Sequence, residues 1–150
     1  MNFFLISFCV AFFSIDRITK LGALLFCTEP LEVNSYLSFW LTYNRGVSFS
    51  FFSSDTPIFS RALLLGILLI TVLLAAHTYK EWLKNNTITG ELFVLIGSFS
   101  NLLDRFFYGA VIDFILFHYK EWSFAIFNIA DVGIVLGVAL MGYYSLRTQA

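Results

Sequence analysis

Four long apolar segments are the feature of this sequence that most constrains its fold. They cover residues 2–26, 57–79, 88–103 and 124–146. Each approaches the roughly 20 residues that a helix needs to cross the hydrocarbon core of a bilayer, although the third is short. Because backbone groups in lipid must pair within their own segment, we expect helices. The sequence therefore predicts an all-α membrane protein with four transmembrane helices, forming a single domain over residues 1–150.

Composition and charge agree with this fold class. Hydrophobic residues make up 59% of the chain and charged residues 13%, which is more apolar surface than one soluble core of this size can bury. The net charge is −1, so the chain has no basic face for nucleic acid. Both observations favour a membrane protein that does not bind nucleic acid.

Four spans put both termini on one side of the membrane and two longer connections, residues 28–56 and 106–123, on the other. From Leu37 to Phe52 the first connection is rich in Tyr, Phe, Trp, Thr and Val, which is typical of strands. We expect a small β-sheet element there, lying on the membrane surface. Asn44 and Gly46 would form a bend in it, where glycine permits a positive φ or a close approach of another backbone.

The positive-inside rule does not settle the orientation. The side with the termini carries three basic residues, Lys80, Lys84 and Arg147. The other side carries or borders six, namely Arg17, Lys20, Arg45, Arg61, Arg105 and Lys120. Taken alone, this count would put the termini outside. Several of the six lie beside acidic residues, however, and could be structural, so the sequence leaves the orientation open.

Charged and amide side chains recur near the ends of the apolar segments, where burial is costly unless they are paired. Asp16 and Lys20 are four residues apart on one helix face and could pair. Asn101, Asp104 and Arg105 form a polar stripe at the end of the third segment. Asn128 and Asp131 lie at the start of the fourth, where either could simply cap a helix. Asp104 with Arg105, and Asp16 with Lys20, could likewise be structural ion pairs.

Asp113 has no such simple explanation, because it lies between Ile112 and Phe114 with no basic neighbour. The sequence lacks a metalloprotease or serine-hydrolase motif, and His77 and His118 fall on opposite sides of the membrane, so we predict neither a metal site nor a cofactor. Two aspartates that share a proton can hydrolyse an amide without a covalent intermediate. Asp113 and Asp131 are candidates, although a spacing of 18 residues is a weak signal.

Two other classes of protein fit some of these features. A small proton- or ion-coupled transporter would also use buried carboxylates, but it usually shows internal repeats and helices broken at the bilayer midplane. A non-catalytic membrane scaffold would leave the two apolar-flanked aspartates unexplained. Here the polar residues gather toward one surface, which favours the peptidase.

Five blocks of sequence, in this order, resemble lipoprotein signal peptidase (signal peptidase II) over nearly the whole chain. They are Asp16-Arg-Ile-Thr-Lys20, Asn44-Arg-Gly-Val-Ser-Phe-Ser50, Gly97-Ser-Phe-Ser-Asn-Leu-Leu-Asp-Arg105, Gly109-Ala-Val-Ile-Asp-Phe114 and Phe127-Asn-Ile-Ala-Asp131. Ser48 and Ser100 stand where the family usually has Ala and Gly. Each block alone is weak, but together they are highly specific.

The resemblance implies that Asp113 and Asp131 are the catalytic aspartates. It implies supporting roles for a further set of residues, which either line the site or hold its geometry: Asn44, Gly46, Asn101, Asp104, Arg105, Asn128, Asp16 and Lys20. The reaction it implies is removal of the signal peptide from prolipoproteins, with cleavage before a diacylglyceryl-modified cysteine.

The resemblance also implies a location and partners. The family lies in the bacterial cytoplasmic (inner) membrane, with four transmembrane helices and cytoplasmic termini. Its site faces the periplasmic side, and a small β-sheet element lies on the outer membrane surface, meaning the periplasmic face of that membrane. It implies diacylglyceryl-modified prolipoproteins and membrane lipids as partners, a monomeric state, and inhibition by globomycin-type cyclic peptides.

Overall fold

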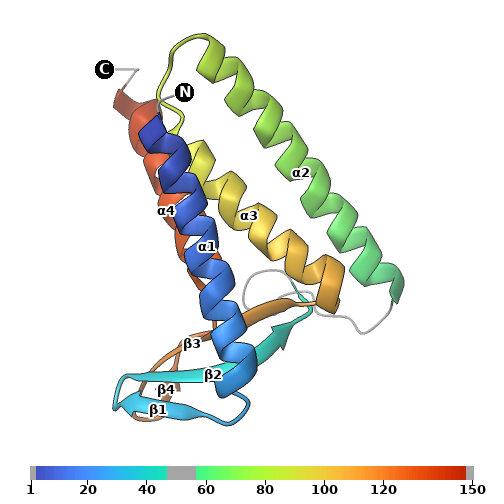
Figure 1. The fold of residues 1–150 in the computed structure, drawn as a ribbon, viewed down its shortest axis with the longest axis vertical. Helices are drawn as coiled ribbons and strands as arrows, with labels where there is room; N and C mark the ends of the chain where they lie inside the picture. The colour runs from blue at the N-terminus through green and yellow to red at the C-terminus, as the bar shows by residue number, and fades with distance from the viewer. Residues whose placement is uncertain (1–2, 47–56, 148–150) are drawn as a thin grey trace.

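Four helices and one small antiparallel sheet make up the fold, with both chain termini at the end of the helices away from the sheet (Figure 1). The computed structural model describes residues 3–46 and 57–147. The helices are α1 (Phe3–Phe26), α2 (Pro57–Leu83), α3 (Thr89–Tyr108) and α4 (Ile129–Arg147). The strands are β1 (Leu31–Asn34), β2 (Leu37–Asn44), β3 (Val111–Tyr119) and β4 (Trp122–Ser123), in the spatial order β1-β2-β3-β4.

The sheet joins the second half of the chain to the first. β2 pairs antiparallel with β3, with Thr42 opposite Asp113 and Asn44 opposite Val111. Phe127 then pairs with Ile115, so the segment that leads into α4 is tied to the same strand. Phe114 and Ile115 pack with Ala23 and Cys27, near and just beyond the end of α1, to form the apolar core. The apolar core therefore combines residues from the first and second halves of the chain.

Helices α3 and α4 form the closest helix pair, whereas α2 packs against α3 and leans away from the rest (Figure 1). Glycines set this separation. A Cβ atom at Gly97 would lie 2.6 Å from the carbonyl oxygen of Ala130, and one at Gly137 would lie 2.6 Å from that of Gly90. These approaches are too short for any larger residue to fit without a shift. The backbones of α3 and α4 are thus nearly in contact along this seam.

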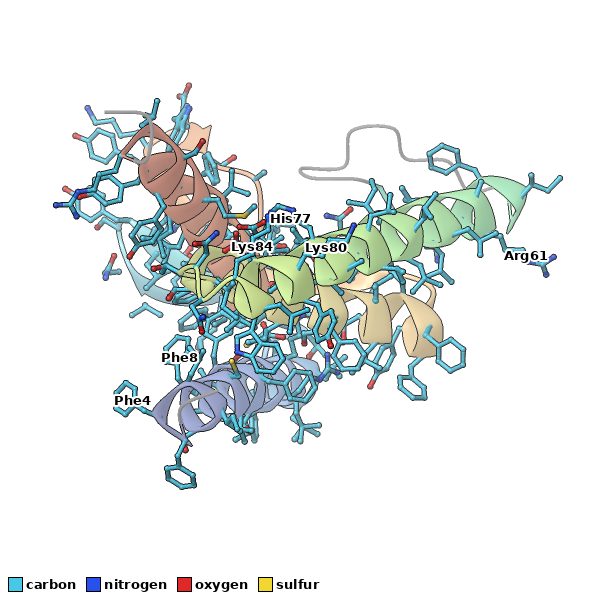
Figure 2. The ribbon with its side chains drawn as sticks, turned by 90° about the horizontal axis from the view of Figure 1, so that it is seen from above. Phe4, Phe8, Arg61, His77, Lys80 and Lys84 are labelled. Atoms are coloured by element: carbon cyan, nitrogen blue, oxygen red, sulfur yellow. The ribbon has the colours of Figure 1, made fainter. Side chains whose placement is uncertain are left out.

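The distribution of polarity is the reverse of that in a soluble protein. Asp16, Lys20 and Asp104 are fully buried, while large apolar side chains cover the outside of the helices. Figure 2 shows this from above, with Phe4 on α1 pointing outward and Arg61 at the opposite end of α2 from Lys84. A polar interior with an apolar exterior is the arrangement that a lipid environment requires.

By length and composition, two of the described helices are apolar enough to cross a membrane: Ile58–Leu83 within α2, and α4. This is fewer than the four spans predicted. The difference has a physical source, because α1 and α3 each contain three charged residues, and Asp16, Lys20 and Asp104 among them are fully buried.

Several predicted segment boundaries need correction. The second and third segments were predicted to end at residues 79 and 103, but α2 continues to Leu83 and α3 to Tyr108. The fourth segment was predicted to begin at residue 124, but α4 begins at Ile129, because the preceding residues contact the sheet instead. The strand predicted from Leu37 to Phe52 ends at Asn44 as β2 within the described chain, and residues 47–52 lie outside the described residues. The sheet is also larger than predicted, because it recruits β3 from the second connection.

Candidate active site

Asn128 connects the two candidate catalytic aspartates. Its amide nitrogen Nδ2 donates to Asp113 Oδ1 at 2.6 Å. Its backbone amide donates to Asp131 Oδ2 at 3.3 Å, and its Oδ1 accepts from the Asp131 backbone amide at 2.9 Å. The last two bonds form a reciprocal capping arrangement at the start of α4, with Asn128 as N-cap and Asp131 three residues later. One side chain thus fixes Asp113 and Asp131 relative to each other.

Asp113 is held at the buried start of β3 and is only 2% exposed. Besides Asn128, it accepts a hydrogen bond from Asn44 Nδ2 at 2.9 Å, across the β2–β3 pairing. Burial raises the pKa of the Asp113 carboxyl to about 7, and the nearby charge of Asp131 adds to the rise, whereas the bonds from Asn44 and Asn128 oppose it. Asp113 therefore exchanges its proton near neutral pH.

Asp131 projects from the first turn of α4, where it is partly buried. Asn101 on α3 donates from Nδ2 to Asp131 Oδ1 at 2.8 Å. The orientation of Asn101 is set in turn by Lys20, whose Nζ donates to Asn101 Oδ1 at 2.8 Å. Because Lys20 occupies the acceptor end of this amide, the donor end faces Asp131.

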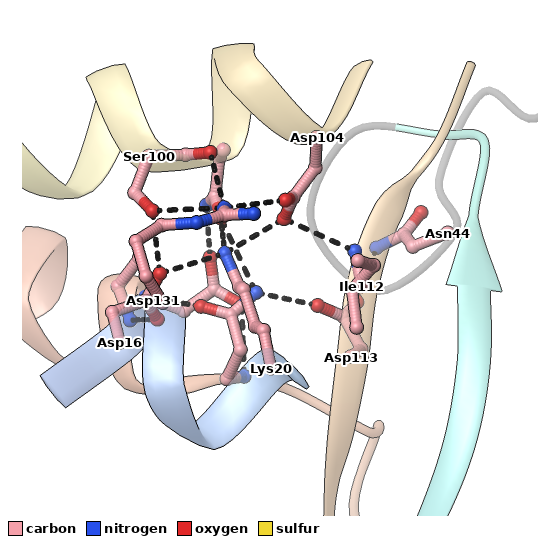
Figure 3. Close-up of polar contacts among 12 residues, drawn as sticks. Asp16, Lys20, Asn44, Ser100, Asp104, Ile112, Asp113 and Asp131 are labelled. Carbon is pink, nitrogen blue, oxygen red and sulfur yellow. Dashed lines mark hydrogen bonds and ion pairs between the residues drawn. The ribbon is translucent and has the colours of Figure 1, made fainter. Parts of the chain in front are cut away.

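Behind these aspartates lies a buried ion cluster that joins α1 to α3 and α4 (Figure 3). Lys20 Nζ lies 3.0 Å from Asp16 Oδ2 and 2.8 Å from Asp104 Oδ2, and all three residues are fully buried. Asp16 also accepts from the backbone amide of Ala130 at 2.7 Å and from Ser100 Oγ at 2.6 Å. Charges that are buried at such cost persist only when paired and hydrogen-bonded on every side, as they are here.

The predicted Asp16–Lys20 pair is present, but the predicted pairing of Asp104 with Arg105 is wrong. Asp104 instead contacts Lys20 and Arg17, both from α1. Adjacent residues on a helix point in different directions, and Arg105 extends the other way, donating to the backbone carbonyl of Gly46. Arg105 thus fastens the end of β2 to α3.

The bend after β2 also lies at the site. The Gly46 backbone amide donates to Asn44 Oδ1 at 3.0 Å, so the Asn44 amide is oriented with its donor end toward Asp113. Ser48, one of the two unusual residues in the motifs, lies outside the described residues.

A cavity of about 460 Å³ opens beside the two aspartates. Its polar lining consists of Asn44, Ser98, Asn101, Arg105, Asp113 and Asp131. The apolar wall comes mainly from α4 and the segment that leads into it, through Phe124, Ile126, Phe127, Val132, Ile134, Val135 and Leu136, while α2 and α3 add one residue each, Ile67 and Leu102. A concave, largely apolar cavity with a few converging polar groups is typical of a ligand site. In it, a protonated and an ionised carboxyl group could activate water together.

Most residues predicted for the site are therefore close together. The cavity is lined by Asn44, Asn101, Arg105, Asp113 and Asp131, whereas Asn128, Asp16, Lys20 and Asp104 lie directly behind them. Gly46 contributes its backbone. Within residues 3–46 and 57–147, no group of three or more His, Cys, Asp or Glu side chains could hold a metal ion.

Two contributors escaped sequence reasoning. Arg17 entered only as one of six basic residues in the orientation count, and Ser100 only as a departure from a motif. Both contact Asp104 or Asp16 from neighbouring helices. The available signal was the position of Arg17 beside Asp16, but contacts between residues 83 apart follow only from the fold.

Comparison with known proteins agrees with the geometry. The signal peptidase (SPase) II family matches residues 8–147. A lipoprotein signal peptidase of Dichelobacter nodosus is 39% identical over 147 residues, covering 93% of this chain and 90% of that protein. One of Mesorhizobium japonicum is 42% identical over 127 residues, covering 79% of this chain and 69% of that protein.

Other relatives are longer than this chain. The match to the lipoprotein signal peptidase of Rickettsia conorii, at 38% identity, covers 78% of this chain but 59% of that protein. Among solved structures, one described as a bacterial membrane enzyme shares the fold with a TM-score of 0.77 and 23% identity, covering 97% of this chain and 89% of that one. On the strength of the family match and the Dichelobacter relative, this chain belongs to the signal peptidase II family, a family of aspartic peptidases.

Proposed function

We propose that this protein removes the signal peptide from prolipoproteins in a bacterial inner membrane, cutting before a diacylglyceryl-modified cysteine. The observation that carries this proposal is the linkage of Asp113 and Asp131 through Asn128 beside a largely apolar cavity. Membership in a family of lipoprotein signal peptidases supports the choice of substrate.

In the proposed reaction the two aspartates share one proton. Two carboxylates in one site cannot readily both ionise. The ionised member accepts a proton from water as the water oxygen attacks the scissile carbonyl carbon, and the protonated member donates to the carbonyl oxygen. When the resulting tetrahedral intermediate collapses, the carbon–nitrogen bond breaks and the leaving amine takes up the proton that the first carboxylate accepted from water. A hydroxyl of the intermediate returns a proton to the second carboxylate, which restores the starting state of the pair. The raised pKa of Asp113 makes it the member that retains the shared proton near neutral pH.

The remaining polar residues hold this pair in place. Asn44 and Asn128 orient Asp113, and Asn101 orients Asp131. Asp16, Lys20 and Asp104 support these amides from behind, and Arg105 fixes the bend at Gly46. In this proposal only Asp113 and Asp131 transfer protons, and the other residues hold these two in position.

The apolar cavity wall suits a lipid-modified substrate. The substrate carries two acyl chains and an apolar signal sequence, and the wall from α4 and the segment before it offers matching apolar contacts. We propose that all four helices span the membrane, that the termini are cytoplasmic and that the protein acts as a monomer. A globomycin-type cyclic peptide, which is amphipathic, should compete for the same cavity.

The test is cleavage of a lipidated precursor by the purified protein in detergent, followed as a mobility shift on a gel. Asp113→Asn and Asp131→Asn should each reduce cleavage at least about 100-fold, because asparagine cannot exchange the required proton. The double variant should be little worse than either single one, because the pair acts as a unit.

Glu32→Gln is the matched control, because it makes the same chemical change at an exposed position on β1 and should cleave normally. A precursor that lacks the lipid should remain uncut. Substantial cleavage by either aspartate variant, with protein inserted at the normal level, would refute the catalytic assignment.

A further inference from the structure

Arg17 makes a set of contacts that the proposed reaction does not yet use. Its Nη1 lies 2.5 Å from Asp104 Oδ1 and donates to the carbonyl oxygen and the hydroxyl of Ser100, each at 3.3 Å. The Arg17 side chain is 26% exposed, whereas that of Asp104 is fully buried. Arg17 therefore closes the buried cluster on the side of α1, at its boundary with the surroundings.

Asp104 connects Arg17 to β3, the strand that carries Asp113. Its other oxygen, Oδ2, accepts from Lys20 Nζ at 2.8 Å and from the backbone amide of Ile112 at 3.3 Å (Figure 3). Ile112 directly precedes Asp113. The Asp104 carboxylate thus holds the start of β3 to the last turn of α3, and Arg17 fixes the orientation of that carboxylate.

Charge balance gives Arg17 a second effect. The cluster contains two carboxylates, Asp16 and Asp104, and two cations, Lys20 and Arg17. Lys20 contacts both carboxylates and cannot neutralise both alone. Without Arg17, the cluster would carry one uncompensated negative charge directly behind the catalytic pair, in a region where buried charges are weakly screened.

We propose that Arg17 is a positioning residue for the peptidase reaction, which orients Asp113 through Asp104 and the Ile112 amide and keeps the buried cluster neutral. This inference rests on the proposed function. Arg17 does not line the cavity, so its effect should fall on the chemical step and not on substrate binding.

The experiment measures kcat, KM and the pH profile of the purified full-length protein on a lipidated precursor. Arg17→Met should lower kcat about tenfold, within the loss expected from a misplaced catalytic group, while KM stays within about twofold. Both limbs of the pH profile should move to higher pH, because the uncompensated charge disfavours ionisation of the catalytic carboxyls. Arg17→Lys, which restores the positive charge, should return both limbs toward their original positions.

The pH result depends on the charges that act on Asp113. These are Asp131 from α4, Lys20 from α1 and Arg105 from α3, while β2 supplies the neutral Asn44. None of these residues changes in the Arg17 variants, so a shift of both limbs reports the charge of Arg17. A role limited to fold stability would not produce that shift or its reversal by lysine.

Arg61→Met is the matched control, because Arg61 is an exposed arginine at the far end of α2 (Figure 2), and it should leave kcat and the pH profile unchanged. If Arg17→Met does not insert into the membrane, Arg17→Gln takes its place and the same measurements decide. An unchanged kcat, an effect on KM alone, or pH limbs that stay fixed would overturn the proposal. Cleavage by the parent protein and its loss in Asp113→Asn test the proposed function separately.

Discussion

Asn128 performs three structural tasks with one side chain and one backbone amide. It caps α4 by accepting the Asp131 backbone amide, donates to Asp113 from its side chain, and donates to the Asp131 carboxylate from its backbone amide. Ala130, two residues later, is also held, because its backbone amide donates to the buried Asp16. The N-terminal end of α4 carries a partial positive charge, which favours carboxylates gathered there. The start of α4 thus fixes Asp131 and helps to orient Asp113, the two aspartates proposed to be catalytic.

Burial of Asp113 predicts a stability that depends on pH. Its pKa rises from 3.8 to about 7 on folding, so protonation favours the folded state. Between these values the unfolded chain loses its proton first, and stability falls as pH rises, by on the order of 4 kcal/mol once pH exceeds about 7. Asp113→Asn removes this titration. The melting temperature of the variant relative to the parent protein should therefore increase steadily from pH 4 to pH 8.

The comparison uses the pH dependence and not the absolute melting temperature, because an amide at position 113 also meets the donor groups of Asn44 and Asn128. That penalty is the same at every pH. Glu32→Gln, at an exposed site, should show no such trend. If the difference in melting temperature between Asp113→Asn and the parent protein stays constant from pH 4 to pH 8, the pKa of Asp113 is not raised by folding.

At the level of elements, the α3–α4 seam sets the distance between Asn101 and Asp131. Gly97 lies one turn before Asn101, and a Cβ atom there would lie 2.6 Å from the Ala130 carbonyl and 2.8 Å from Ile134 Cγ1. Ala130 immediately precedes Asp131. Any separation of the two helices at this point therefore stretches the 2.8 Å bond from Asn101 to Asp131.

Gly97→Ala should lower both stability and activity. Forcing an extra methyl group into this contact costs about 1–3 kcal/mol, and the loss should appear as a lower melting temperature together with slower cleavage. Gly142→Ala is the control on α4, because a Cβ atom there meets nothing within 4 Å. Equal behaviour of the two variants would mean that the seam does not control the site.

The helices and strand β2 were largely predictable from the sequence, whereas β1, β3 and β4 were not. Long apolar runs define α2 and α4 with little ambiguity. Val111–Tyr119 lacks a clean alternation because its first five residues are all buried, so the segment was interpreted only as a connection. Residues 124–128 are apolar enough to extend a helix, but Phe127 pairs with Ile115 in the sheet instead.

The site, too, could be predicted from the sequence only in part. Motif resemblance identified Asp113, Asp131 and their amide partners, because these residues occur at recognisable spacings. It did not show that Asp104 pairs with Arg17 in place of Arg105, because that depends on how α1 lies against α3. Contacts within one helix can be inferred from the spacing of residues in the sequence. Contacts between two helices can be inferred only when the way the helices pack against each other is known.

For the molecule as a whole, burial of charge supports the proposal that all four helices span the membrane. The four helices contain 24, 27, 20 and 19 residues, or about 28–40 Å at 1.5 Å per residue, which matches a hydrocarbon core of about 30 Å. The cost of the charged residues in α1 and α3 is reduced because Asp16, Lys20 and Asp104 pair with one another in the interior.

The arrangement predicts a definite topology. The α2–α3 connection after Lys84 lies at the same end as both termini, and the turn between β3 and β4 lies at the opposite end (Figure 1). If the catalytic pair faces the outside, as cleavage of an exported precursor requires, the first end is cytoplasmic. A reporter that is active only after export should therefore be inactive when fused after Lys84 and active when fused after Glu121. A reporter that is active only in the cytoplasm should give the reverse pattern, and export of the Lys84 fusion would overturn the orientation.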